Sequence, residues 1–259
     1  MRWIMPTPAK VICLGMLAAS LGLQPVFAVN NTEGQDAASP VTTSSELVVT
    51  HRPKSINFEQ ERASPDVRHV FDWVLDSGNN HGLPFVIIDK KEAKVFVFYA
   101  DGRLRGAAPA LLGSAVGDDS VPGIGDRKLS SIRPEERTTP AGRFVAALDL
   151  NLHGKAMLWV DYDAAISMHP VITSNVEEQR AQRLATPTPD DNRISYGCIN
   201  VPPEFFKKVV GPAFKRTNGI VYVLPEIRTL QQVFAFYDVD ERTRLRLAAR
   251  IDVDRAERR

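Results

Sequence analysis

Apolar residues along this chain change their spacing near residue 84. Ahead of that point they recur at the three- and four-residue spacing of one helix face, at Val67, Val70, Phe71 and Val74. Ser64 followed by Pro65 is typical of a helix start, and Gly78 of a helix end. We therefore predict a short helical segment within residues 64–83.

From residue 84 onward the pattern is that of short strands. Runs rich in β-branched and aromatic residues alternate with turn signals such as Asp101-Gly102. The predicted strands are Phe85–Ile88, Val95–Tyr99, Leu104–Leu112, Arg143–Leu150, Ala156–Tyr162, Ala164–His169 and Gly219–Leu224. One helix is predicted near Pro203–Val210. The expected fold class is mostly β (α+β): a β-rich domain over residues 84–225 with a few peripheral helices.

The N-terminal residues have the order of a secretory signal peptide. Basic Arg2 and Lys10 precede an apolar run of 13 residues, and the small residue Ala28 follows it. That run is shorter than the roughly 20 residues of a membrane-spanning helix. We expect cleavage after residues 1–28, a periplasmic or cell-envelope location, and no stable membrane anchor in the mature chain.

Two further segments flank the predicted domain. Residues 29–63 are polar and are predicted to be a flexible linker. Residues 226–259 are predicted to be a helical extension, with apolar positions at 230, 233, 234 and 237 and an arginine-rich end. A solvated helix with interspersed charges is the favoured interpretation of that end, and an arm that contacts a polymer or partner is the alternative.

Charge and cysteine content restrict the classes of function and site that we expect. The chain has 32 Lys and Arg against 31 Asp and Glu, so no strong field favours nucleic acid. Cys13 leaves with the signal peptide, so Cys198 has no partner for an intramolecular disulfide. A zinc site needs three or four clustered ligands, and one cysteine with scattered histidines predicts neither a metal nor another cofactor.

The segment around Cys198 is the strongest candidate for chemistry. It reads Ser195-Tyr196-Gly197-Cys198-Ile199-Asn200, and its glycine permits a tight turn and a close approach of substrate. A thiol is mostly un-ionised at neutral pH, so a nucleophilic cysteine needs a nearby base, usually histidine. All five histidines precede Cys198, an order that disfavours papain-like enzymes.

This segment resembles the Ser/Thr-His-Gly-Cys-hydrophobic-Asn/Arg motif of the YkuD-type L,D-transpeptidases. Thr139-Pro140-Ala141-Gly142-Arg143-Phe144 is similar to the Thr-Pro-x-Gly-x-Phe segment of the same family. The hairpin from Phe85 to Gly117 looks like its opening strands. The resemblance covers roughly residues 84–225 and implies a cysteine acyl-transferase that acts on peptidoglycan stem peptides.

The resemblance implies a role for each matching residue. Cys198 is the nucleophile and His169 its base, with His153 as the alternative base. The Gly197 and Cys198 N–H groups would stabilise the oxyanion. Ser195 would orient His169 or meet the substrate, and Arg193 a stem carboxylate, unless both only hold the loop. The predicted substrate-binding residues are Arg193, Tyr196 and Asn200.

The sequence departs from the family pattern at three places. Pro170 follows His169 where glycine is usual, Tyr196 stands where histidine is frequent, and residues 177–191 look inserted. An amine acceptor would make the chain a transpeptidase, and water would make it an L,D-carboxypeptidase or a hydrolase of the same bond. A non-catalytic wall-binding scaffold with the same fold is the third alternative.

Overall fold

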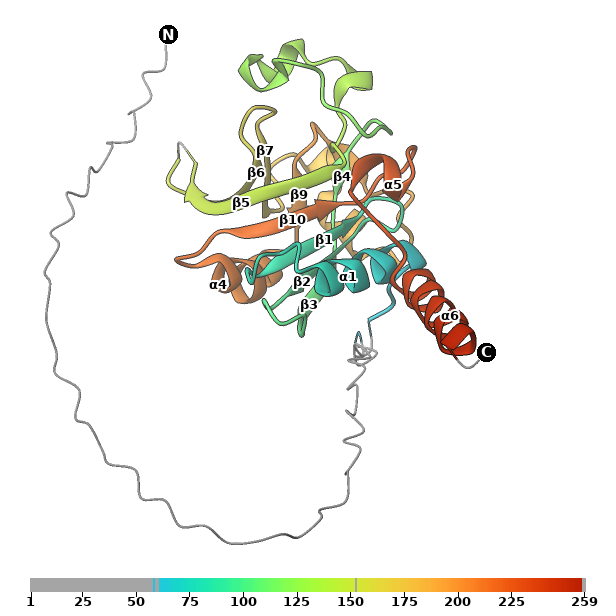
Figure 1. Ribbon diagram of the computed structural model, residues 1–259. Coiled ribbons are helices and arrows are strands. Elements are labelled where there is room, and N and C mark those ends of the chain that lie inside the picture. Colours follow the sequence, from blue (N-terminus) through green and yellow to red (C-terminus); the bar gives the residue numbers. More distant parts are fainter. Residues whose placement is uncertain (1–57, 59–60, 152, 258–259) are drawn as a thin grey trace, which may run out of the picture. The chain divides into compact units, whose positions relative to one another are not determined.

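The computed structural model describes residue 58, residues 61–151 and residues 153–257, the last six of these without their side chains (Figure 1). The predicted signal peptide, Cys13, His51 and most of the predicted linker lie outside the described residues. The fold class is mostly β with a few helices, as the sequence predicts.

One eight-stranded sheet forms the body of the fold, in the order β3-β2-β1-β10-β5-β6-β7-β9. Its strands are β1 (Phe85–Asp89), β2 (Lys94–Phe98), β3 (Leu104–Pro109), β5 (Gly142–Leu150), β6 (Ala156–Asp161), β7 (Ile166–Pro170), β9 (Ile199–Val201) and β10 (Gly219–Val223). Two short strands, β4 (Leu112–Gly113) and β8 (Arg193–Ser195), pair in parallel beside it. Most neighbours are antiparallel, but β1–β10 and β7–β9 are parallel.

The predicted strands are present, with their ends moved by a few residues. The largest difference between a predicted and an observed strand is at Leu104–Leu112, which the structure divides between β3 and β4. The sequence missed β8 and β9, which have three residues each. They are too short to carry an alternating pattern, yet they flank Cys198.

The two faces of β1 belong to two cores. Phe85 and Ile87 pack with α1 (Pro65–Ser77), which Figure 1 shows lying across this part of the sheet. Val86 and Ile88 face the other core, together with α3 (Pro203–Phe205), the π-helical turn η5 (Phe206–Val210) and α4 (Gly211–Phe214). Both faces are therefore buried, which explains why the strand reads as an uninterrupted apolar run.

Helix α1 has the ends that the sequence predicts. The Ser64 hydroxyl accepts a hydrogen bond from the Val67 N–H, and Gly78 takes the left-handed conformation at the C-terminus. The folded part begins earlier than predicted, however. Phe58, placed in the linker by the sequence, is buried and its ring lies 5.4 Å from that of Phe71. A single aromatic residue in a polar stretch gave no signal for this.

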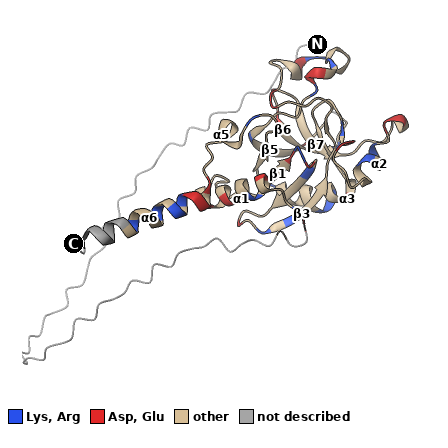
Figure 2. Ribbon diagram, turned by 90° about the vertical axis from the view of Figure 1, so that its right-hand side faces the viewer, with Lys and Arg blue, Asp and Glu red and all other residues tan. Residues whose placement is uncertain are grey.

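The C-terminal segment, predicted to be a helical extension, contains two helices. Helix α5 (Leu230–Val233) ends after one turn because Phe234 is extended, and Leu230 and Phe234 both pack into the core beside α1. Helix α6 (Val239–Glu257) follows. Its described side chains are mostly exposed, and Figure 2 shows acidic residues at its start followed by basic residues separated by uncharged ones.

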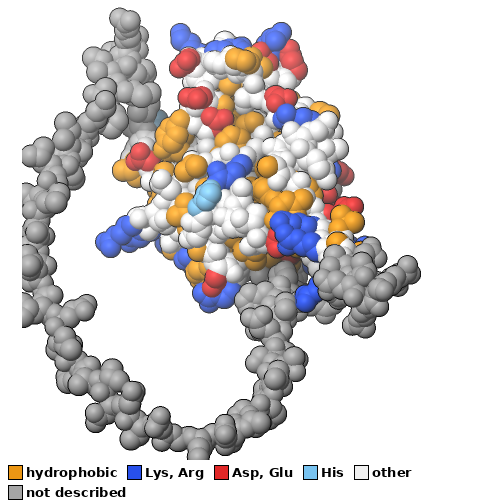
Figure 3. Space-filling view, in the orientation of Figure 1, with side chains coloured by type: hydrophobic (Ala, Val, Ile, Leu, Met, Phe, Trp, Pro, Cys, Tyr) orange, Lys and Arg blue, Asp and Glu red, His pale blue; other side chains and the backbone are white. Residues whose placement is uncertain are grey.

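The distribution of charged side chains on the surface agrees with the nearly equal numbers of basic and acidic residues in the sequence. On the face that Figure 3 shows, basic and acidic side chains are interspersed among hydrophobic ones. In the part of the chain that the structure describes, no helix is both long enough and apolar enough to cross a bilayer.

Between β4 and β5 the chain makes a long excursion, residues 119–138, that contains three 3₁₀ turns. They are η1 (Ile124–Asp126), η2 (Leu129–Ser131) and η3 (Pro134–Glu136). A second irregular segment, residues 171–192, joins β7 to β8 and contains η4 (Val176–Glu178) and α2 (Arg180–Ala185). Residues 177–191, which looked inserted, lie in this second segment.

Candidate active site

The parallel pair β7–β9 brings His169 and Cys198 together. In its register His169 is the partner of Asn200, and Met168 of Ile199. Met168 and Ile199 are fully buried in the core. Because side chains alternate along a strand, His169 and Asn200 point to the opposite face, and Cys198 precedes Asn200 by two residues on that same face.

The Cys198 thiol lies at the end of this face. Its Sγ is 3.7 Å from the Ser167 Oγ and 3.7 Å from the Ala165 carbonyl oxygen. The His169 side chain lies close enough to the thiol to lower its pKa. Cys198 is partly exposed, so it is reachable from solvent. The structure thus groups Ser167, His169 and Cys198, and sequence reasoning had missed Ser167.

Pro170 orients the imidazole. The His169 Nδ1 lies 2.9 Å from the Pro170 carbonyl oxygen. A carbonyl only accepts hydrogen bonds, so Nδ1 carries the hydrogen and Nε2 is left to exchange a proton with the thiol. The proline that departs from the family pattern therefore keeps the group this contact needs, since proline lacks an N–H but retains its carbonyl.

The two groups favour a thiolate–imidazolium pair. Burial alone would raise the pKa of the Cys198 thiol, but the hydrogen bond and charge of His169 outweigh it and lower that pKa. For His169, burial would lower the pKa, but the hydrogen bond and charge of Cys198 outweigh that effect and raise it. Both shifts favour a nucleophilic sulfur with a protonated base beside it.

His153, the alternative base, lies elsewhere. It is exposed in the turn between β5 and β6, where its N–H donates to Asn151. The structure therefore favours His169 as the partner of Cys198.

Gly197 fits where no other residue would. Its φ of +125° is in the range that favours glycine, and a Cβ would stand 2.6 Å from the Thr138 carbonyl oxygen. Its carbonyl accepts a hydrogen bond of 2.8 Å from the Thr139 hydroxyl. The Gly197 N–H donates to the Ser195 hydroxyl at 3.1 Å. Because that N–H is already hydrogen-bonded within the loop, it does not fit the role of oxyanion donor that the resemblance implied.

Ser195 holds the loop. Its hydroxyl donates to the Cys198 carbonyl at 2.7 Å while it accepts from Gly197, and the residue is 3% exposed. It contacts neither His169 nor solvent to any extent. Of the alternatives for this residue, the structure supports the purely structural one.

Arg193 is also structural. Its guanidinium pairs with Glu226 and donates to the Lys90 carbonyl at 3.0 Å. The expectation that Arg193 meets a substrate carboxylate is not matched by this geometry, because Glu226 and the Lys90 carbonyl occupy both of its terminal nitrogens. The partner, Glu226, lies 33 residues further along the chain, so the motif alone could not predict this ion pair.

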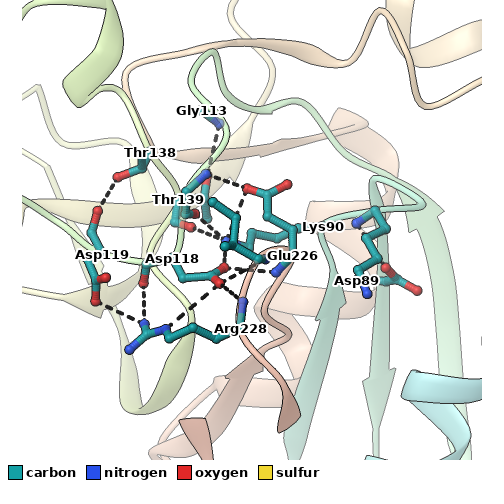
Figure 4. Close-up of polar contacts among 12 residues, drawn as sticks. Asp89, Lys90, Gly113, Asp118, Asp119, Thr138, Thr139, Glu226 and Arg228 are labelled. Carbon is teal, nitrogen blue, oxygen red and sulfur yellow. Dashed lines mark hydrogen bonds and ion pairs between the residues drawn. The ribbon is translucent and has the colours of Figure 1, made fainter. Parts of the chain in front are cut away.

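Arg193 contacts a buried ionic cluster through Glu226, and Figure 4 shows the Lys90, Asp118 and Glu226 side chains of this cluster. The Lys90 ammonium donates to Asp118 at 2.7 Å, to the Gly117 carbonyl at 2.6 Å and to the Thr139 carbonyl at 3.0 Å. Glu226 lies 3.3 Å from the same ammonium. Every donor of Lys90 is used, as a buried charge requires. The cluster fixes both ends of the excursion 119–138 and the backbone of Thr139.

Thr139 carries this order to the cysteine loop. Its hydroxyl accepts a hydrogen bond of 2.9 Å from the Gly113 N–H and donates to the Gly197 carbonyl. Thr139 is fully buried and opens the Thr-Pro-x-Gly-x-Phe segment. The two motifs noted in the sequence thus meet in the structure through one side chain.

A pocket of about 110 Å³ opens beside Cys198. Its walls come from the excursion 119–138, from the turn that precedes β7, and from Tyr196. The Arg137 guanidinium stacks over the Tyr196 ring, 4.0 Å from its centroid. Tyr196 is therefore the one predicted substrate-binding residue that lines the pocket.

Asn200 links the site to residues 171–192. Its side-chain amide N–H donates to the Cys198 carbonyl at 3.2 Å, and its Oδ1 accepts from the Arg180 guanidinium at 2.8 Å. Asn200 is 1% exposed, so it positions other groups more than it meets a ligand. Sequence reasoning had missed Arg180, because nothing near it in the chain marks it.

The described residues hold no group of three or more His, Cys, Asp or Glu side chains arranged to bind a metal ion. The chemistry available at the site is that of a thiol, an imidazole and hydrogen-bond donors.

Comparison with known proteins gives a structural likeness only. No protein-family profile matches the sequence, and no curated protein matches it. The fold is similar to that of solved L,D-transpeptidases. One is the catalytic domain of the Enterococcus faecium L,D-transpeptidase, at 18% identity and a TM-score of 0.34, over 54% of this chain and 96% of that one.

Two other structures are similar over part of their length. The helical cell shape determining protein Pgp2 of Campylobacter jejuni is 16% identical, with a TM-score of 0.38, over 57% of this chain and 49% of its own. The L,D-transpeptidase of Xylanimonas cellulosilytica is 15% identical, with a TM-score of 0.35, over 55% of this chain and 60% of its own. The chain thus spans about half of the Pgp2 chain.

Proposed function

We propose that this chain is an exported cysteine acyl-transferase that acts on peptidoglycan stem peptides by L,D-transpeptidation. The observation that carries the proposal is the Cys198 thiol beside a pocket, with its pKa lowered by the nearby His169. The solved structures of similar fold include L,D-transpeptidases, and the proposal gives this chain that reaction class on the ground of its own site residues.

The first half-reaction forms a thioester. The Cys198 sulfur attacks the carbonyl carbon of the third stem residue, at its L-centre, and a C–S bond forms as the amide C–N bond breaks. His169, which holds the thiol proton, gives it to the leaving amine of the terminal D-residue. The hydrogen bond between Nδ1 and Pro170 supports this role, because it leaves Nε2 as the ring nitrogen that can exchange a proton.

The second half-reaction releases the enzyme. An amine of a neighbouring stem attacks the thioester carbonyl, His169 takes its proton, and Cys198 leaves as the thiolate. Backbone N–H groups are the proposed donors to the tetrahedral oxyanion. With Gly197 engaged by Ser195, the Cys198 N–H is the remaining donor of the two that the sequence suggested.

The test uses the protein without residues 1–28 and purified muropeptides with tetrapeptide stems. Intact-protein mass spectrometry should detect an acyl adduct on Cys198, and product analysis should detect loss of the terminal residue with formation of cross-linked dimers. Cys198→Ala should abolish both. His169→Gln should lower the rate by about 10²-fold or more.

The outcomes separate the alternatives. Monomeric tripeptide without dimers would assign the hydrolase reaction, with water as acceptor. Absence of adduct and product from a folded protein would favour the wall-binding scaffold. Turnover that survives Cys198→Ala would contradict the mechanism.

A further inference from the structure

Arg180, which lies outside the motifs recognised in the sequence, stands close to the catalytic pair. It is the first residue of α2, in the segment 171–192. Its Nη1 donates to the Asn200 Oδ1 at 2.8 Å, and Asn200 is the register partner of His169. Its Nε donates to Glu178, and this ion pair uses none of the terminal nitrogens. The Arg180 side chain is only 13% exposed, so its charge is held in place.

The guanidinium has donors to spare. Arginine carries five N–H groups in a planar fork that matches a carboxylate. The contacts with Glu178 and Asn200 use Nε and one hydrogen of Nη1. Among the described residues no acceptor is bonded to Nη2. The charge of Arg180 is also felt by His169, whose pKa it lowers against the larger effect of Cys198.

Three other arginines lie around the cysteine loop, and each is engaged differently. Arg127 donates to Glu136 at 3.0 Å, Arg193 pairs with Glu226, and Arg137 stacks on Tyr196 and donates to the Ile132 carbonyl at 3.2 Å. Arg180 alone among these four is bonded to a residue of the strand pair that bears His169 and Cys198.

We propose that Arg180 binds the terminal carboxylate of the donor stem peptide and so selects substrates that end in a free acid. This inference rests on the proposed function, in which the bond that breaks joins the terminal residue to the third. That residue's carboxylate lies one residue from the attacked carbonyl, or about 4 Å along the chain. The segment 171–192 would then contribute to substrate specificity. Through Arg180 it would supply the positive charge that the Arg form of the motif carries at position 200, where this chain has asparagine.

The first experiment measures charge selection at Cys198 without requiring turnover. Iodoacetate and iodoacetamide alkylate the same thiolate, but only iodoacetate carries a carboxylate. The ratio of their rate constants therefore cancels the ionised fraction of the thiol. Arg180→Gln should lower this ratio about tenfold, the size of one charge-assisted hydrogen bond, and Arg180→Lys should retain part of it.

Two matched variants control this ratio. Arg183 lies on the same helix and donates to the Glu178 and Asp191 carbonyls, so Arg183→Gln loosens the segment without removing Arg180. Its ratio should stay at the wild-type value. Arg137→Gln tests the rival cation that stacks on Tyr196, a residue of the pocket wall. An equal drop in Arg183→Gln, a drop in Arg137→Gln alone, or an unchanged ratio in Arg180→Gln would each overturn the proposal.

The second experiment compares two donor stems, a tetrapeptide with a free terminal carboxylate and the same peptide as its terminal amide. The wild-type protein should prefer the acid in kcat/KM, and Arg180→Gln should lose that preference about tenfold while the amide is turned over at a similar rate. A preserved preference would contradict the role of Arg180 alone. If the wild-type protein turned over neither peptide, the proposed function would fail, and the alkylation ratio would still decide whether Arg180 attracts a carboxylate.

Discussion

The Thr139 hydroxyl donates a hydrogen bond of 2.8 Å to the carbonyl of Gly197, the residue immediately before Cys198. The same hydroxyl accepts from the Gly113 N–H at 2.9 Å. One buried side chain therefore connects β4, the start of β5 and the cysteine loop. Removing it would leave a buried donor and a buried acceptor without partners.

Thr139→Val should destabilise the fold by about 1–3 kcal/mol, because both backbone groups lose their partner. Thr139→Ser retains the hydroxyl and should recover most of that loss. Urea denaturation measures the free energy of unfolding, and alkylation of Cys198 reports on the loop. Equal stability of the Val and Ser variants would show that the hydroxyl contributes nothing.

Gly197→Ala should disable the cysteine loop. The new Cβ would meet the Thr138 carbonyl oxygen and the Ile166 side chain at 2.6 and 2.7 Å, on a backbone with φ of +125°. We expect a loss of about 3 kcal/mol in stability, with slowed alkylation of Cys198. Gly154→Ala is the matched control, since its φ is +70° with nothing within 4 Å, and it should cost only about 1–2 kcal/mol.

The pH dependence of Cys198 alkylation should reflect His169. The pKa of the thiol is lowered, because His169 outweighs the effect of burial, so the rate should persist below the pH at which an ordinary thiol protonates. His169→Gln removes the cause and should move the profile to higher pH. Ser167→Ala removes a weaker contact and should move it less in the same direction. Identical profiles for wild type and His169→Gln would exclude the ion pair.

Asp118 should make the fold sensitive to acid. Burial alone would raise its pKa, but N–H groups of residues 226–228 and the Lys90 ammonium outweigh burial and lower the pKa to about 2. The carboxylate is ionised when folded and protonates near 3.8 when unfolded, so its stabilisation is complete above that pH. About 2 kcal/mol should be lost as the pH falls from 4 to 2. Asp118→Asn should reduce the loss measured over that window.

Phe58 should be needed for full stability, although it precedes the predicted helix. It is 5% exposed and packs against the rings of Phe71, Phe96 and Phe98. Phe58→Ala should cost about 3–5 kcal/mol in urea denaturation. A loss below 1 kcal/mol would instead place this residue outside the core, in the linker that the sequence predicts.

The sequence predicted most of the sheet and the helix α1, because their apolar residues repeat at a regular period and their ends carry clear signals. Strands β8 and β9 were missed because three residues cannot show a period. The break between α5 and α6 was not predicted either. Phe234 is extended and ends α5, yet it packs into the core with Leu230, and such packing is not visible in the spacing of apolar residues.

The resemblance pointed to Cys198 and His169, and the parallel pairing of β7 with β9 brings these two residues together. Ser167 was not recognised although it lies two residues from His169, because a lone serine in a strand carries no signal. Ser195 lies within the motif and Arg193 two residues before it, but both hold the loop, because Gly197 and Glu226 are their partners. Arg180 could not be found, because its relation to the site depends on how residues 171–192 fold back onto Asn200.

The parallel pairing of β7 with β9 has a consequence for how such a protein can change. Parallel neighbours need a crossover connection, and here residues 171–192 and β8 provide it while the sheet itself fixes the spacing of imidazole and sulfur. The length and composition of that crossover can therefore vary without moving the reactive atoms. New preferences for a leaving group can arise in the connection while the bond-breaking step stays the same.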